Sequence, residues 1–217
     1  FLISKYNNVK KLWWIYGLTN VGLLTFVFIF LYANSRSWLI FPLLAVAMAI
    51  VLFGNYCHKS YKQRIRKKVD EQMKVSLLSV LMMLLPIIFV IIITVLMMAS
   101  SAENIKLMIA YGFIIFFGWI TAIILGMTFK TLPFIVWNKV YHQLAGKRKT
   151  PNPKDLFSNR VFRWMGICYI SGFILFSAGI FVGHAIVLQT GAIFLVGTSL
   201  LYNINVMKLL MHKPGSV

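Results

Sequence analysis

The chain has 217 residues, of which 60% are hydrophobic and only 12% are charged, whereas soluble domains average about 45–50% apolar and about 25% charged residues. These few charged side chains cannot cover the surface of a soluble globule, and 18 Phe and 6 Trp exclude a disordered chain. With 22 Lys and Arg against four acidic residues, the formal net charge is +18. The composition therefore predicts a membrane protein.

Six apolar stretches follow one another along the chain, each long enough to cross ~30 Å of hydrocarbon as a helix. None of them contains Asp, Glu, Lys or Arg, and they cover residues 13–33, 38–57, 75–98, 107–129, 164–183 and 185–207. Because the stretches are continuous and do not alternate, they fit helices better than the strands of a closed barrel. We therefore expect an all-α integral membrane protein with six transmembrane helices, in a single membrane domain over residues 1–217.

Local sequence features refine this reading of the helices. Pro86 lies inside the third stretch and predicts a kink. Residues 100–103 match a capping box that opens the fourth helix. Gly179 and Gly183 form a GxxxG pair at the end of the fifth stretch, which favours close helix packing. Because only a tight turn around Gly183-His184 separates the last two stretches, we expect them to form an antiparallel hairpin.

Basic residues lie in alternate connectors. Residues 1–11 hold three Lys, residues 58–74 hold seven basic residues, residues 130–163 hold eight and the C-terminal tail holds two, whereas the other connectors hold only Arg36 and Lys106. The positive-inside rule then places both termini and the long loops 58–74 and 130–163 in the cytoplasm. Membrane topology explains this charge without nucleic acid, so the expected neighbours of the basic loops are anionic lipid headgroups.

Aromatic and amphipathic residues mark the predicted membrane interfaces. Five tryptophans lie near predicted span ends, as belt residues do: Trp13, Trp14, Trp38, Trp137 and Trp164. Residues 130–145 keep apolar positions at Leu132, Ile135, Val136, Val140 and Leu144. This spacing predicts a short amphipathic helix that lies in the inner interface and bends at Pro133. The basic, proline-containing residues 146–153 then predict a solvated connector.

The polar residues inside the spans are uncharged. They are expected to form hydrogen bonds between helices, and they are Asn20, Thr25, Gln189, Thr198, Asn203 and Asn205. No Asp, Glu or His lies at mid-depth, which disfavours a proton- or sodium-driven carrier acting alone. No Walker motif, HExxH, GxSxG or CxxC occurs in the sequence. We therefore predict no catalytic residue.

Candidate metal ligands are few. The inner-side helix ends carry His58, His142, His212, Cys57 and Cys168 at similar depth. Nothing in their spacing requires the three or four groups of a metal site to converge. His184 lies at the outer end of the sixth helix, where the alternative reading is a haem or copper ligand acting with Met98 or Met108. Methionine also fills apolar cores, so we expect no cofactor-binding or metal-binding residue in this chain.

One segment resembles a known family. Tyr111-Gly112 and Gly118-Trp119 precede the run Leu125-Gly126-Met127-Thr128-Phe129-Lys130-Thr131-Leu132-Pro133-Phe134. This pattern resembles a helix end in bacterial membrane proteins related to haem–copper oxidase subunit I and to the NnrS group. Those proteins are bundles of about twelve helices, and many are tied to haem, copper or nitric oxide handling. The resemblance implies that the six helices are half of such a protein, or one subunit of it, in the bacterial cytoplasmic (inner) membrane.

The resemblance carries no ligand over to this chain. Metal-binding members usually have a histidine early in such a helix, and residues 105–111 contain none. Any haem or copper is therefore expected in the wider assembly, with other membrane subunits or further helices as partners. We favour a subunit or half-protein that packs and does not itself catalyse. The alternatives are a transporter or channel component, and a membrane scaffold that docks a partner through its basic cytoplasmic loops.

Overall fold

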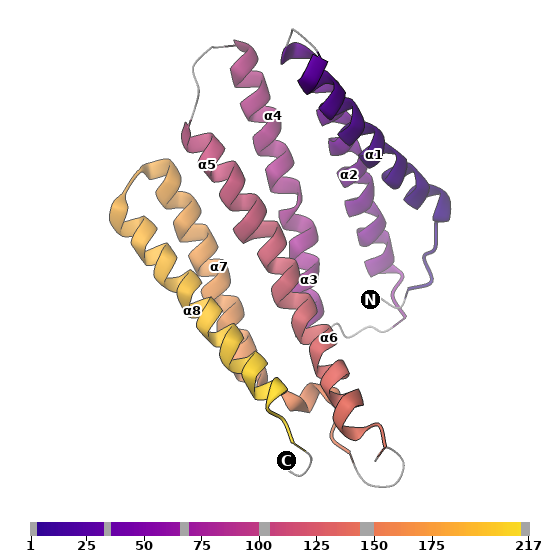
Figure 1. The fold of residues 1–217 in the computed structure, drawn as a ribbon, viewed down its shortest axis with the longest axis vertical. Coiled ribbons are helices and arrows are strands. Elements are labelled where there is room, and N and C mark those ends of the chain that lie inside the picture. The colour runs from indigo at the N-terminus through magenta and orange to yellow at the C-terminus, as the bar shows by residue number, and fades with distance from the viewer. Residues whose placement is uncertain (1–3, 33–35, 66–69, 100–104, 144–149, 214–217) are drawn as a thin grey trace. The chain divides into compact units, whose positions relative to one another are not determined.

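The computed structural model describes residues 4–32, 36–65, 70–99, 105–143 and 150–213 (Figure 1). Within these residues the chain is all helical apart from one isolated antiparallel bridge between Ser4 and Arg64. Six helical segments are long and apolar enough to cross a membrane: Val9–Tyr32, Ser37–Lys62, Glu71–Leu96, Ile105–Tyr141, Asn159–Val182 and Ala185–Leu210. The predicted all-α fold with six candidate membrane-spanning helices is confirmed.

The described helices reach further than the apolar stretches that predicted them, because polar and basic residues continue a helix beyond the hydrocarbon. The second helix runs to Lys62, and the fourth runs to Tyr141. In chain order the elements are α1 (Val9–Tyr32), η1 (Arg36–Leu39), α2 (Ile40–Lys62), α3 (Glu71–Met82), α4 (Leu84–Ala99), α5 (Ile105–Phe113), η2 (Ile114–Ile120), α6 (Thr121–Tyr141), η3 (Pro153–Leu156), α7 (Asn159–Val182) and α8 (Ala185–Leu210).

The chain divides into two compact units. Unit 1 comprises Phe1–Asp70 and Leu77–Trp119, and unit 2 comprises Glu71–Ser76 and Ile120–Val217. The division falls inside α3 and just before α6, so the first turns of α3 belong with α6, α7 and α8. The single membrane domain expected over residues 1–217 stays a prediction.

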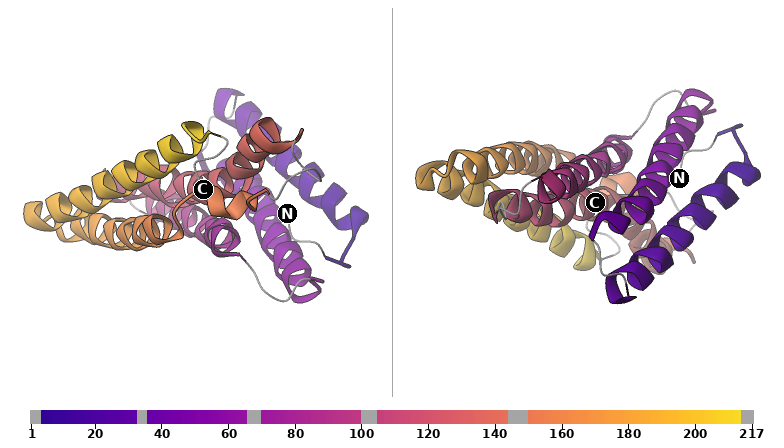
Figure 2. Two further views of the ribbon diagram at one scale, coloured as in Figure 1. Left: turned by 90° about the horizontal axis from the view of Figure 1, so that it is seen from below. Right: turned by 90° about the horizontal axis from the view of Figure 1, so that it is seen from above.

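In unit 1, α1 and α2 pack against each other at Gly22 (Figure 2). Gly22 is the buried residue of α1. A Cβ atom at this position would lie 2.8 Å from Cγ2 of Val46 and 3.2 Å from the carbonyl oxygen of Pro42. Pro42 lies in the first turn of α2, where a missing N–H costs no helical hydrogen bond. The glycine therefore allows the close helix approach that stabilises helix pairs in lipid.

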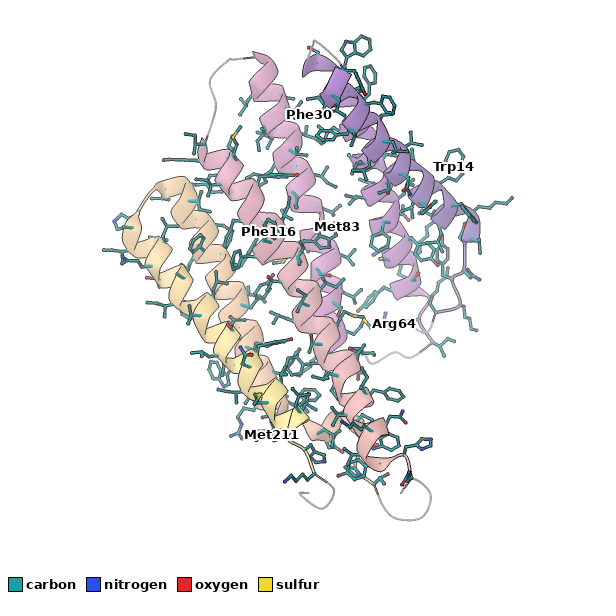
Figure 3. All side chains as sticks on the ribbon, viewed as in Figure 1. Trp14, Phe30, Arg64, Met83, Phe116 and Met211 are labelled. Atoms are coloured by element: carbon teal, nitrogen blue, oxygen red, sulfur yellow. The ribbon has the colours of Figure 1, made fainter. Side chains whose placement is uncertain are left out.

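The third span is interrupted at Met83, between α3 and α4 (Figure 3). The Met83 N–H still donates to the Ser79 carbonyl at 2.9 Å, so one turn persists at the break. Pro86 lies in the first turn of α4, the part of a helix that tolerates proline. The boundary between α3 and α4 therefore falls three residues before Pro86, and the kink expected at Pro86 stays a prediction.

The fourth span is a continuous helix from α5 through η2 to the end of α6. Its 37 residues correspond to about 55 Å at the α-helical rise, well beyond the ~30 Å of a bilayer core. The prediction of a separate helix over residues 130–145 is wrong, because residues 130–141 continue α6 without a break at Pro133. The interfacial position and the bend at Pro133 stay predictions. Pro133 and Val136 are buried within unit 2. Packing of this face holds the helix together beyond the apolar stretch. Residues 144 and 145 lie outside the described residues.

In unit 2, α7 and α8 form the predicted antiparallel hairpin, side by side in both views of Figure 2. Gly183 makes the turn with a left-handed φ of 72°, and its N–H donates to the Gly179 carbonyl at 2.8 Å. A Cβ atom on Gly179 would lie 2.9 Å from the Leu188 nitrogen, and one on Gly191 would lie 2.6 Å from the Phe176 nitrogen. The two glycines of the predicted GxxxG pair thus have different roles. Gly179 packs against α8 at Leu188, whereas Gly183 forms the turn between α7 and α8.

Candidate functional site

A half-enclosed cavity of about 560 Å³ lies within unit 1. It is lined by side chains of α1, α2, α4, α5 and η2, together with Leu39 and Met83. Aliphatic residues of α2 such as Leu43, Val46 and Ile50 make up much of the wall. Among the described residues that line it, none is charged. A cavity of this size and apolar lining has the character of a small-molecule site.

Four polar side chains interrupt this apolar wall. The hydroxyl groups of Thr19 and Thr94 donate to carbonyls one turn earlier in their own helices, each at 2.8 Å. Tyr111 and Trp119 also line the cavity. Their phenol and indole groups have no hydrogen-bond partner among the residues that the structure describes. The wall therefore offers two donors, the Tyr111 O–H and the Trp119 N–H.

Two departures from α-helical geometry border the cavity. Tyr111, Ile115 and Trp119 are spaced by four residues, and such positions drift by about 40° per step around an α-helix. The π-helix η2 turns less per residue, which reduces the drift and keeps the three side chains on the cavity. Met83 and Pro86, at the break between α3 and α4, line it too. π-helical turns such as those of η2 occur frequently at functional sites.

The composition and the motifs of the sequence do not mark Tyr111 and Trp119 as cavity residues. They stand out there only as parts of the Tyr-Gly and Gly-Trp pairs of the family resemblance. The signal that points to them is the spacing of four residues from Tyr111 through Ile115 to Trp119 on an otherwise apolar helix. The π-helix that brings them into line has no recognisable sequence signal.

Unit 2 contains a polar clasp in which Asn205 of α8 holds the residue that precedes α7. The Asn205 Oδ1 accepts from the Ser158 N–H at 2.9 Å, and its Nδ2 donates to the Ser158 carbonyl at 3.1 Å. Asn205 is 1% exposed. Ser158 is the N-cap of α7, and its hydroxyl accepts from the Val161 N–H. The clasp thus fixes the start of α7 against the end of α8.

Two further contacts fix the same end of unit 2. The Trp137 indole N–H donates to the Pro151 carbonyl at 2.7 Å. The Tyr141 hydroxyl is hydrogen-bonded to Nε2 of His212 at 2.8 Å. The connector predicted to be solvated is therefore anchored from Pro151 onward, and residues 146–149 lie outside the described residues. Trp137 holds this connector, which is a different role from the lipid belt expected of it.

An aromatic cluster lies beside the clasp. The Phe129 ring, 2% exposed, has its centroid 5.4 Å from Phe157, 5.2 Å from Phe162 and 5.7 Å from Tyr202. These rings come from α6, the segment before α7, α7 itself and α8. Aromatic pairs at such distances contribute about 0.5–1.5 kcal/mol beyond their buried area. The cluster makes this end of unit 2 a rigid structural core.

The expectation of hydrogen bonds between helices fails for four polar residues in the spans. Each bonds a carbonyl of its own helix, at 2.7–2.9 Å: Asn20, Thr25, Thr198 and Asn203. A carbonyl four residues earlier is always within reach of such a side chain, so no partner helix is needed. Asn205 bonds across elements but to backbone atoms, and Gln189 is exposed.

The histidines and cysteines are not among the described residues that line the cavity. His58, His142 and His184 are exposed, and both cysteines are free. Among the described residues, no three His, Cys, Asp or Glu side chains gather as a metal ion requires. His184 is the N-cap of α8 in unit 2, whereas Met108 belongs to unit 1. The expectation that none of these residues is a ligand stays a prediction.

Large apolar and aromatic side chains cover the outer faces of the helices. On α1, Trp14 is 68% exposed and Phe30 is 69% exposed (Figure 3). Trp13, Trp38 and Trp164 are exposed as well, which is consistent with a tryptophan belt at the membrane interface. Such surfaces suit a lipid environment.

Comparisons of this chain with protein-family models, with curated proteins and with solved structures find no match. The resemblance to haem–copper oxidase subunit I therefore depends on residues 111–134 alone. The structure places these residues on one continuous helix, with Tyr111 and Trp119 facing the cavity of unit 1 and Phe129 in the core of unit 2. The six apolar helices make the chain a multi-pass membrane protein.

Proposed function

We propose that this chain is a six-span subunit, or half, of a larger helical membrane protein related to haem–copper respiratory proteins, with a packing role in that assembly. The supporting observation is that its helices carry two kinds of glycine. One kind lies against a neighbouring helix, where an added Cβ would meet other atoms at 3.1 Å or less: Gly22, Gly126, Gly172, Gly179 and Gly191. The other kind has open space within 4 Å of that position: Gly17, Gly54, Gly112, Gly166 and Gly197.

The second kind of glycine supports an assembly larger than this chain. A glycine inside a helix costs about 0.8–1.0 kcal/mol relative to alanine, and at these five no described residue packs close enough to the Cβ position to offset the cost. In lipid, small residues allow helices to approach closely, and this contact drives association. Further helices, from the same polypeptide or another subunit, are the partners that fit such positions.

The topology proposed for this assembly has both termini and both long loops in the cytoplasm. In unit 1, the Lys5 N–H donates to the Gln63 carbonyl at 3.2 Å, and the Tyr6 ring packs edge-on against Tyr56 at 5.2 Å. The start of the chain and the end of α2 therefore lie together. This end of unit 1 carries Lys5, Lys10, Lys11, Lys59, Lys62 and Arg64. The positive-inside rule supports placing it in the cytoplasm, against anionic headgroups.

Unit 2 shows the same asymmetry. The end fixed by the Asn205–Ser158 clasp carries basic residues in the last turns of α6 and α8 and the first turns of α7: Lys139, Arg160, Arg163 and Lys208. Each unit thus has one basic end. This supports a multi-pass protein of the bacterial cytoplasmic membrane. A reporter fused near Thr150 is expected to read cytoplasmic and one near Glu103 external, and the reverse pair of readings would refute this topology.

The packing role is tested by substituting the open glycines. Purification in a mild detergent should yield a complex well above the 24.9 kDa of this chain. Gly166→Leu and Gly197→Leu should each reduce the complex toward the lone chain, because leucine blocks close helix approach. Leu210→Ile, exposed on α8 and about 140° around that helix from Gly197 at 100° per residue, is the matched control and should leave the complex intact. A monodisperse lone chain from native membranes would contradict the proposal.

The relation to haem–copper proteins is tested separately, on the same native complex. A Soret band or stoichiometric copper in the complex supports the relation. If haem were bound by this chain itself, the band would be lost on His184→Ala. A colourless, metal-free complex would instead favour the membrane scaffold that docks a partner through its basic loops.

A further inference from the structure

We infer that the cavity of unit 1 binds a neutral, single-chain lipid whose head carries a hydrogen-bond acceptor oxygen. The cavity is the site described above, lined by α1, α2, α4, α5 and η2. The inference does not depend on the proposed packing role, because every residue that carries it lies within unit 1.

The wall of the cavity selects a neutral, largely apolar ligand. Its described lining is aliphatic and aromatic, with no charged side chain. A charged group inside such a wall would lose its hydration without gaining an opposite charge, which costs far more than apolar contacts return. An alkyl chain, in contrast, fits a surface of this kind without penalty.

The two free donors select an acceptor oxygen on the ligand. The Thr19 and Thr94 hydroxyl groups already donate to their own helices. The Tyr111 hydroxyl and the Trp119 N–H have no partner among the described residues, and indole can only donate. Inside a membrane no bulk water is present to satisfy them. An acceptor oxygen on the ligand, such as an ester or ketone carbonyl, would satisfy either donor.

The size of the cavity fits a small molecule. Its volume of about 560 Å³ lies within the range of about 300–1,000 Å³ that ligand pockets have. A single flexible chain with a small head can fill it.

The test uses tryptophan fluorescence of the protein as purified in mild detergent, whether it is a lone chain or part of a complex. The probe is a monoacylglycerol brominated on its chain, which quenches tryptophans that it contacts. We expect saturable quenching, with the saturable part lost in Trp119→Phe. Tyr111→Phe keeps the ring but removes one donor, so it should raise the half-saturation concentration by about two- to twelve-fold. Tyr16→Phe, exposed on α1 and outside the cavity, is the matched control and should leave it unchanged.

Two further arms make the test decisive. Val90→Phe places a larger side chain in the cavity and should abolish saturable quenching, whereas Ile92→Phe on an exposed part of the same helix should not. The fatty acid with the same brominated chain carries a carboxylate and should bind at least ten-fold more weakly at neutral pH. Quenching that never saturates, or that persists unchanged in both Trp119→Phe and Val90→Phe, would show surrounding lipid only and overturn the inference. Equal binding of the carboxylate would overturn the neutral-ligand assignment.

Discussion

Replacing Asn205 with alanine is expected to open the end of unit 2 that the clasp holds. The substitution removes two hydrogen bonds, at 2.9 and 3.1 Å, and leaves the Ser158 N–H and carbonyl without these partners. Each lost bond is worth about 0.5–1.5 kcal/mol, and a buried group left unsatisfied costs about 1–3 kcal/mol. Because the opened segment can reach water at the membrane surface, we expect a total of about 2–4 kcal/mol.

That free energy translates into a measurable opening of the segment before α7. Since about 1.4 kcal/mol corresponds to a factor of ten, the open fraction should rise by about 30- to 700-fold. Limited proteolysis at Lys154, which lies in η3 inside this segment, measures that fraction. When opening and closing are fast, the cleavage rate follows the equilibrium population of the open form.

Asn203 provides a matched control two residues away on the same helix. It is exposed, and its side chain bonds the Ser199 carbonyl of α8 itself. Asn203→Ala should therefore leave the cleavage rate within two-fold of wild type. Asn205→Asp keeps the acceptor but loses the donor, so it should fall between the two alanine variants. If Asn205→Ala and Asn203→Ala were cleaved at the same rate, the clasp would carry no stability and the reasoning would be wrong.

Two further substitutions probe the packing of α6. Gly126→Ala should destabilise unit 2 by about 1–3 kcal/mol, because the new Cβ would lie 2.6 Å from the Ser76 backbone nitrogen; a loss below 0.5 kcal/mol in an unfolding titration would contradict the close approach. Val136→Ala should cost more than Ile135→Ala, by about 1–2 kcal/mol, because Val136 is 8% exposed and Ile135 is 60% exposed. Equal losses in the same titration would restore the interfacial helix that the sequence predicts.

The six spans were predictable because membranes impose a simple rule on the sequence. A helix in hydrocarbon excludes charge over about 20 residues, and all six apolar stretches obey it. The kink expected at Pro86 depends on an equally local feature, the missing N–H of proline. The turn at Gly183 follows from the short link between two long apolar stretches. These features depend on residues that are neighbours in the chain.

The predictions that were wrong concern contacts between residues that are distant in the sequence. An apolar stripe along residues 130–141 fits a helix on the membrane surface and a helix that packs against the rest of unit 2 equally well. Two hydrogen bonds favour the packed helix over the surface helix. Trp137 donates one to Pro151, and Tyr141 shares the other with His212. For the same reason the sequence does not show that Asn205 bonds Ser158 while Asn203 bonds its own helix.

The cavity belongs to a third class, since only half of its geometry has a sequence signal. Pro86, which lines the cavity in the first turn of α4, is a sequence signal for irregular helix geometry near that point. The π-helix η2, over Ile114–Ile120, also lines the cavity. It consists of ordinary apolar and aromatic residues with one glycine, and no residue type in it requires the wide turn. Tyr111 and Trp119 therefore converge on one cavity for a reason that lies in helix geometry.

Gly166 offers a test in which stability and assembly should respond with opposite signs. Its Cβ position is open, so Gly166→Ala should stabilise the isolated chain by about 0.5–1 kcal/mol through helix propensity alone. If a further helix packs there, the added methyl group should weaken that contact, and the complex should dissociate at a lower detergent concentration. Proteins commonly retain such costly residues where function needs them. A variant that is more stable and assembles equally well would show that this glycine serves no partner, and would remove Gly166 from the packing surface that we propose.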